Sequence, residues 1–110
     1  MKKFNINDIG GQVVKDNETY LLEDNRLLNN LVLSKTTLHA GKETTGHRHS
    51  GSEEVYNFIK GKGEMIVGNT TYKVSGGDIV LIPDGEFHKV FNLSKTKDLE
   101  FICVFQTYSR

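Results

Sequence analysis

The chain has 110 residues, which is enough for one domain with one modest hydrophobic core. Its 14 Lys and Arg balance its 14 Asp and Glu, and without a positive excess neither a nucleic acid nor an anionic membrane is expected as the main partner. No stretch is apolar enough for a secretory signal or a membrane span, so we expect a cytoplasmic protein. The single cysteine, Cys103, excludes an internal disulfide and lies in an apolar run that indicates a buried strand.

Short runs of β-branched, aromatic and aliphatic residues alternate with polar or glycine-bearing turns along the chain. Residues 1–30 are the least regular part and predict one or two edge strands, with residues 23–30 forming either one helical turn or a loop. Strands are expected at 20–22, 31–38, 54–59, 64–67, 71–74, 78–82, 88–92 and 99–105. This spacing is typical of an antiparallel sandwich or barrel, so the predicted class is all-β. Because edge strands often pair with a second subunit, we also expect a homodimer.

The histidines predict a metal site. His47 and His49 share one face if their segment is extended, and Glu54 begins the strand that follows. Along that strand Glu54 and Tyr56 lie on the same face, whereas His88 begins a separate strand. Two imidazoles, a carboxylate and a third imidazole from neighbouring strands can converge inside a small barrel. Such ligands suit Mn, Fe, Co, Ni, Cu or Zn.

Each of these residues also has an ordinary structural explanation. A His-x-His pair can be exposed on a strand, Glu53 and Glu54 can form a solvated corner, and His88 can be an exposed strand residue. His39 fits the end of a strand better than a fifth ligand. The glycine and proline framework around these residues favours the metal site over the ordinary explanations.

Residues 41–61 read GKETTGHRHSGSEEVYNFIKG, and residues 77–92 read GDIVLIPDGEFHKVFN. The first has Gly, five residues, His-x-His, four residues, Glu, six residues and Gly. The second has Gly, five residues, Pro-x-Gly, two residues, His, three residues and Asn. Position by position, the two segments resemble the two signature motifs of the cupin superfamily. Matching motifs of this length are specific when they occur together, although a motif match alone stays a hypothesis.

The resemblance implies that residues 1–110 form a single cupin domain, an antiparallel jelly-roll or double-stranded β-helix barrel with residues 1–30 as an N-terminal arm or edge strands. It implies one divalent transition metal near the mouth of the barrel. The implied metal ligands are His47, His49, Glu54 and His88. Glu53 is the alternative carboxylate, because choosing it would shorten the gap after the histidines to three residues.

Three imidazoles and one carboxylate would leave two positions open on a six-coordinate ion, so a small ligand could bind through two oxygens. The first hypothesis is a Lewis-acid isomerase, epimerase or lyase that acts on a sugar, sugar phosphate or keto acid. Tyr56 is its candidate catalytic residue, either as a proton donor or as a hydrogen-bond partner of the substrate, and a core aromatic with its hydroxyl at the rim is the equally good structural explanation. On strand 31–38, whether Lys35 or the pair Ser34 and Thr36 points inward depends on a register that the sequence leaves open.

Two alternatives remain. The first is an iron-dependent dioxygenase, as many of the cupins that this chain resembles are. The second is a metal-dependent module that binds a small molecule without catalysis. Oxygen consumption with Fe(II) would separate the first alternative from Lewis-acid chemistry. The metal itself, whether Mn, Fe, Ni or Zn, is left open, because metal affinities follow a general order that this ligand set does not override.

Overall fold

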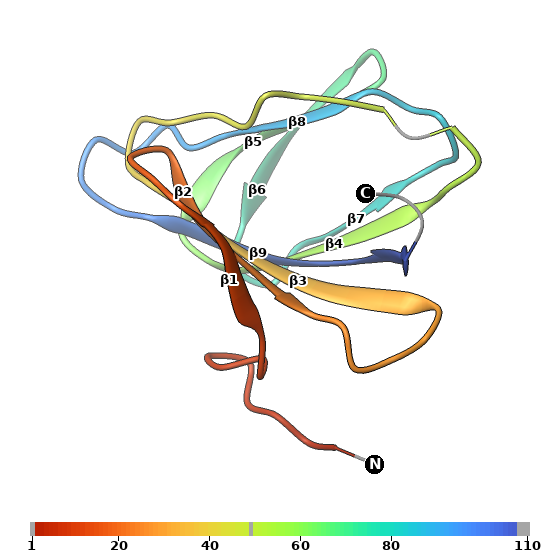
Figure 1. Cartoon of the computed structure of the whole chain (residues 1–110). Coiled ribbons are helices and arrows are strands. Elements are labelled where there is room, and N and C mark those ends of the chain that lie inside the picture. The colour runs from red at the N-terminus through yellow and green to blue at the C-terminus, as the bar shows by residue number, and fades with distance from the viewer. Residues whose placement is uncertain (1, 49, 108–110) are drawn as a thin grey trace.

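The computed structural model describes residues 2–48 and 50–107, which form nine β-strands (Figure 1). The strands are β1 (Gln12–Asp16), β2 (Tyr20–Asn25), β3 (Leu31–Leu38), β4 (Glu54–Lys60), β5 (Lys62–Val67), β6 (Thr70–Ser75), β7 (Ile79–Ile82), β8 (His88–Phe91) and β9 (Leu99–Gln106). Within these residues no helix has the length and apolar character needed to cross a membrane.

The strands form two antiparallel sheets that face each other. The larger sheet has the order β1-β2-β3-β9-β4-β7, and the smaller has the order β6-β5-β8. In Figure 1 the small sheet and the connection between β3 and β4 close over the concave side of the large sheet. This arrangement is the double-stranded β-helix barrel, so the predicted all-β jelly-roll fold is confirmed. The predicted edge strand in the first thirty residues is β1, and β7 forms the opposite edge.

The core lies between the two sheets, because each strand from β3 to β9 turns apolar side chains inward, whereas β1 is exposed along its length. On β4, Glu54, Tyr56 and Phe58 are buried while Val55 is exposed, as the predicted alternation requires. Cys103 is buried on β9, as expected from its apolar run. The core cluster consists of Val32, Leu38, Tyr56, Phe58, Met65, Val74, Ile82, Val90, Leu99, Phe101, Cys103 and Phe105.

The prediction of a helical turn or loop over residues 23–30 is wrong for its first part. β2 continues through Asn25 and pairs with β3 along its whole length. The polar sequence Glu23-Asp24-Asn25 is typical of a turn, but Asp24 and Asn25 are buried within the paired strands β2 and β3. The Asn25 side-chain amide donates a hydrogen bond of 2.6 Å to the carbonyl of Ile9, which compensates its burial. Strand pairing therefore overrides the local turn preference.

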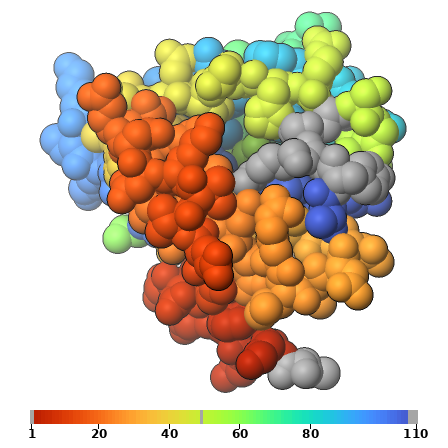
Figure 2. All heavy atoms as spheres, viewed as in Figure 1, coloured from red at the N-terminus to blue at the C-terminus, as the bar shows by residue number. Residues whose placement is uncertain are grey.

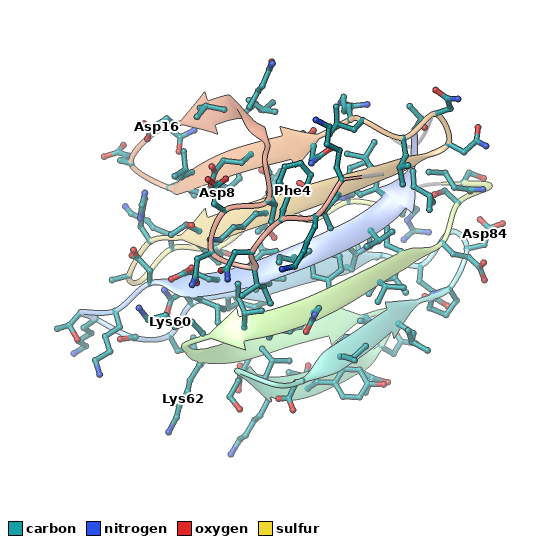
Figure 3. All side chains as sticks on the ribbon, turned by 90° about the horizontal axis from the view of Figure 1, so that it is seen from below. Phe4, Asp8, Asp16, Lys60, Lys62 and Asp84 are labelled. Atoms are coloured by element: carbon teal, nitrogen blue, oxygen red, sulfur yellow. The ribbon has the colours of Figure 1, made fainter. Side chains whose placement is uncertain are left out.

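The register of β3 decides which polar side chains face the interior. Ser34 and Thr36 lie on the buried face with the core residues of that strand, whereas Lys35 lies on the opposite face. The Lys35 ammonium donates a 3.1 Å hydrogen bond to the carbonyl of Asn7 and lies 3.5 Å from the Glu100 carboxylate. Lys35 thus holds the N-terminal segment on the outer face of the large sheet. Figure 3 shows that segment lying over this sheet, with Phe4 and Asp8 labelled.

Asn92, the last residue of the second motif, links three backbone segments. It is only 2% exposed, and its amide donates hydrogen bonds to the carbonyls of Leu38 (2.9 Å), His39 (3.1 Å) and Lys97 (2.8 Å). Its side-chain oxygen accepts a bond from the Ser94 N–H at 3.0 Å. The side chain thereby ties the end of β3 to the loop before β9.

Asn92→Ala is expected to lower the free energy of unfolding by about 2–4 kcal/mol, because it leaves buried carbonyl groups without donors. Urea denaturation of the variant and the parent protein measures this change. Asn69→Ala, at an exposed position in the turn between β5 and β6, is the control and should change the midpoint little. Equal midpoints for Asn92→Ala and the parent would contradict a structural role for this amide.

Candidate metal centre

Two of the predicted ligands come from different sheets and meet in the interior. Glu54 is the first residue of β4 in the large sheet, and His88 is the first residue of β8 in the small one. Both side chains are buried, and the Nε2 atom of His88 lies 3.4 Å from Oε1 of Glu54. The contact therefore depends on how the two sheets pack rather than on any local segment.

His47 reaches the same place from the connection between β3 and β4. Its backbone pairs with His88: the N–H of each residue donates to the carbonyl of the other, at 3.1 and 2.9 Å. The two imidazole rings lie edge to face with centroids 4.4 Å apart. Gly46 permits this approach, because its φ is +81° and a Cβ there would lie 2.7 Å from the Phe87 ring.

His47, Glu54 and His88 each offer one ligand atom, and these atoms all lie within 4.8 Å of one another. His88 is oriented by its other ring nitrogen, since Nδ1 lies 3.0 Å from the Glu86 carbonyl, to which an N–H at this position donates. That bond leaves Nε2 as the nitrogen that faces Glu54 and a bound ion. Histidine ligands of metals typically have such a second hydrogen bond.

The electrostatics of this cluster favour a positive charge. Burial by itself lowers the pKa of His88, but the hydrogen bonds to Glu54 and the Glu86 carbonyl, together with the Glu54 charge, raise that pKa above its ordinary value. The negative Glu54 carboxylate therefore stabilises positive charge at Nε2 of His88. Two imidazoles and a carboxylate are also the donor set that suits a divalent transition metal, so these residues fit the ion that the resemblance implies.

The remaining predicted residues have different positions. His49 lies outside the described residues, so its role stays a prediction. Glu53 is exposed and sits beside the buried Glu54. His39 follows the end of β3 and faces Asp98, with Nδ1 and Oδ1 3.3 Å apart, as expected for a strand-end residue.

Tyr56 lines a cavity of about 330 Å³ together with His47 and Glu54. Its ring lies edge to face with His88, with centroids 5.7 Å apart, and stacks on Phe101 at 5.3 Å. The other residues that line the cavity are Val14, Lys15, Tyr20, Leu22, Thr36, Thr44, Thr45, Cys103 and Phe105. The contributions of β1 and β2 were not predicted, because no motif marks them and their place depends on sheet order.

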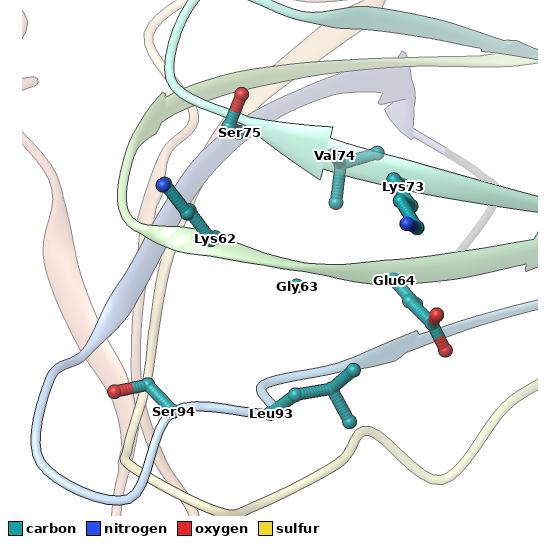
Figure 4. A pocket seen from close by; sticks show the side chains of 8 residues that line it. All are labelled: Lys62, Gly63, Glu64, Lys73, Val74, Ser75, Leu93 and Ser94. Carbon is teal, nitrogen blue, oxygen red and sulfur yellow. The ribbon is translucent and has the colours of Figure 1, made fainter.

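A second, more open groove lies where β5 begins and β6 ends, at the end of β5 that is far from His88 (Figure 4). It is lined by Lys62, Gly63, Glu64, Lys73, Val74, Ser75, Leu93 and Ser94. Although its volume of about 560 Å³ exceeds that of the inner cavity, the described residues that line it include none of the predicted ligands and no histidine. The chemistry therefore points to the inner cavity.

Comparison with known proteins identifies the family. Residues 34–105 match the family model for the cupin domain. An uncharacterised protein of Methanocaldococcus jannaschii is 31% identical over 77 residues, which cover 70% of this chain and 62% of that protein. The oxalate-binding protein of Thermotoga maritima is 29% identical over 73 residues, covering 66% and 60%. The chain therefore spans about three fifths of the length of these curated relatives.

Among solved structures, an uncharacterised conserved protein from Klebsiella pneumoniae with a double-stranded β-helix domain superposes with a TM-score of 0.82. The sequence identity is 20%, and the match covers 100% of this chain and 94% of that one. At this identity the likeness supports the fold alone.

Proposed function

Because the chain belongs to the cupin family, we propose that it binds one divalent transition metal and uses it as a Lewis acid on a small oxygen-rich metabolite. The proposed ligands are His47, Glu54 and His88, with His49 as the fourth. The observation that carries the proposal is the convergence of three donor atoms within 4.8 Å beside a cavity of about 330 Å³. Sugars and keto acids are the substrate classes that offer two oxygens to such a site.

The bound ion would supply polarisation of a ligand oxygen, which favours isomerase, epimerase or lyase chemistry. Three features of the protein's own side chains would support this chemistry. His88, held at Nδ1 by the Glu86 carbonyl, keeps its Nε2 directed at the site. Phe101 and Phe105 line the cavity with apolar aromatic surface, beside which electrostatic interactions are stronger than in water. Tyr56 places a hydroxyl-bearing ring in the same cavity and is our candidate for proton transfer to the ligand.

Metal analysis by plasma mass spectrometry of protein purified without an affinity tag tests the proposal. About one Mn, Ni or Zn per chain would support Lewis-acid chemistry and direct the substrate screen to sugars and keto acids. About one Fe, together with oxygen uptake, would replace this reaction class with the dioxygenase alternative. Absence of metal after reconstitution would overturn the metal site.

A second candidate function is metal-dependent binding of a small ligand without catalysis. It is favoured by the relative named an oxalate-binding protein, although that protein is matched over 60% of its length. Both candidates use the same three side chains. They differ in whether Tyr56 affects turnover or only affinity.

Tyr56→Phe separates the two candidates. If Tyr56 transfers a proton, the variant should lose about 100-fold or more in turnover of the substrate found in the screen, with unchanged metal content. Tyr20→Phe is the matched control, since Tyr20 lines the same cavity from β2. Steady-state kinetics together with metal analysis measures both variants. Equal turnover in Tyr56→Phe and the parent would contradict the catalytic role of this hydroxyl.

A further inference from the structure

We propose that Lys15 binds an anionic group of the ligand whose other end is held at the metal site, so that among the small oxygen-rich metabolites proposed above a dicarboxylic acid, including a keto acid with a second carboxylate, is preferred over a sugar. The inference rests on the proposed function and adds to it a residue that determines ligand class. Lys15 belongs to β1, the edge strand, and lies outside both sequence motifs.

A β-bulge directs Lys15 toward the cavity. In the pairing of β1 with β2, Val13 lies opposite Glu23 while Lys15 lies opposite Leu22, so Val14 is an extra residue in β1. Strict alternation from Val13 would place Lys15 on the same face as Val13, away from the interior. The extra residue instead places Lys15 on the face of Leu22, which is buried and lines the cavity.

The charges around the cavity leave the Lys15 ammonium available for a ligand. Among the described residues that line the cavity, Lys15 is the one Lys or Arg. Its strand is exposed along its whole length and lies at the surface in Figure 2, and no carboxylate in the described part of the chain forms an ion pair with Lys15. The described Lys35 and Lys89, by contrast, pair with Glu100 and Glu43. A lysine directed at a ligand cavity without an acidic partner is a natural anion-binding group.

The position of Lys15 in the fold complements that of the metal site. β1 and β4 are separated by three strands in the large sheet, yet Lys15 and Glu54 line the same cavity. A ligand between them therefore meets a cation from the protein at one side and the proposed ion at the other. Tyr20 and Leu22, which line the wall from the neighbouring strand, provide contact for a short carbon chain.

Size and charge restrict the ligand further. The cavity of about 330 Å³ corresponds to roughly ten water volumes, so the ligand has about that number of non-hydrogen atoms. One ammonium neutralises one carboxylate, whereas a phosphate group carries a charge of roughly −2 and is usually held by more donors. These limits favour a second carboxylate over a phosphate at the Lys15 end.

The test compares diacids with their monoamides, which keep the shape but lose one charge. Malonate, malonamate, succinate and succinamate are titrated by calorimetry into Mn²⁺-loaded parent protein, Lys15→Met and Lys95→Met. Lys95 is an exposed loop lysine and controls for loss of net charge. The parent should prefer at least one diacid over its monoamide by about three- to fivefold, a modest value because Lys15 is exposed. The preference should weaken with added salt.

We expect Lys15→Met to lose this preference while retaining its metal, and Lys95→Met to keep both. An unchanged preference in metal-loaded Lys15→Met would overturn the role of Lys15 and leave the proposed function standing. Failure of the metal-loaded parent to prefer either diacid would overturn the ligand class. Failure of the parent to bind metal at all would overturn the proposed function, and the role of Lys15 with it.

Discussion

His88→Ala is expected to reduce metal affinity by more than about 100-fold, since loss of an inner ligand should exceed the 10–100-fold effects seen when a residue that merely orients a ligand is changed. His47→Ala should do the same from the other side of the cluster. The two variants differ in how far they endanger folding, because the His88 side chain is fully buried while His47 is exposed. Metal content after dialysis, with a competition titration, measures the effect.

His39→Ala is the matched control, because His39 lies at the end of β3 and faces Asp98 instead of the cluster. It should retain the metal of the parent protein. If His88→Ala unfolds the chain, circular dichroism will reveal it, and the exposed His47→Ala variant still tests the ligand set. Stoichiometric metal in a folded His47→Ala variant would contradict its assignment as a ligand.

The second large effect on metal affinity concerns the adjacent glutamates Glu53 and Glu54. Glu54→Gln should weaken metal binding by about 10-fold or more, because the amide retains the shape but removes the charge that attracts the cation. Glu53→Gln should leave the affinity within about twofold, since an exposed charge is well screened by solvent. The pair is a stringent comparison, because the two residues are adjacent in sequence but one is buried and the other exposed.

Titration of both variants with the same metal by calorimetry gives the ratio of affinities. Equal losses would mean that net charge near the site matters more than ligation. A larger loss for Glu53→Gln would require β4 to have the opposite face inward, against the burial of Tyr56 and Phe58.

Much of the fold could be predicted because its signals are local. Alternation along β4 identified the buried face that contains Glu54, Tyr56 and Phe58, and the structure confirms it. The motif glycines are informative because they satisfy backbone requirements: Gly61 has a φ of +95°, and a Cβ there would lie 2.5 Å from the Asp98 carbonyl oxygen. Polar residues at 23–25 were misleading, since pairing with β3 overrides their turn preference.

The candidate site was predicted through residue types and spacing, and three of its four predicted ligands lie together. His49 lies outside the described residues and stays a prediction, as do the homodimer and the cytoplasmic location. Thr36 was one of two alternatives for the inward face of its strand, and the register of β3 selects it. Tyr20 could not be predicted, because it carries no distinctive spacing and its place in the cavity with Tyr56 follows from how the strands pack.

The sequence by itself determined the all-β class, the buried face of β4 and the set of candidate ligands, because side-chain alternation and turn chemistry act between residues close in the chain. The tertiary structure alone decided that His47 pairs with His88, that Ser34 and Thr36 face inward, and that a bulge directs Lys15 to the cavity. These features depend on the register in which strands pair, and for His47 with His88 and for β3 with β9 the paired residues are far apart in the chain. A shift of one residue in the register would move every side chain of the strand to the opposite face of the sheet, and no local pattern specifies that register.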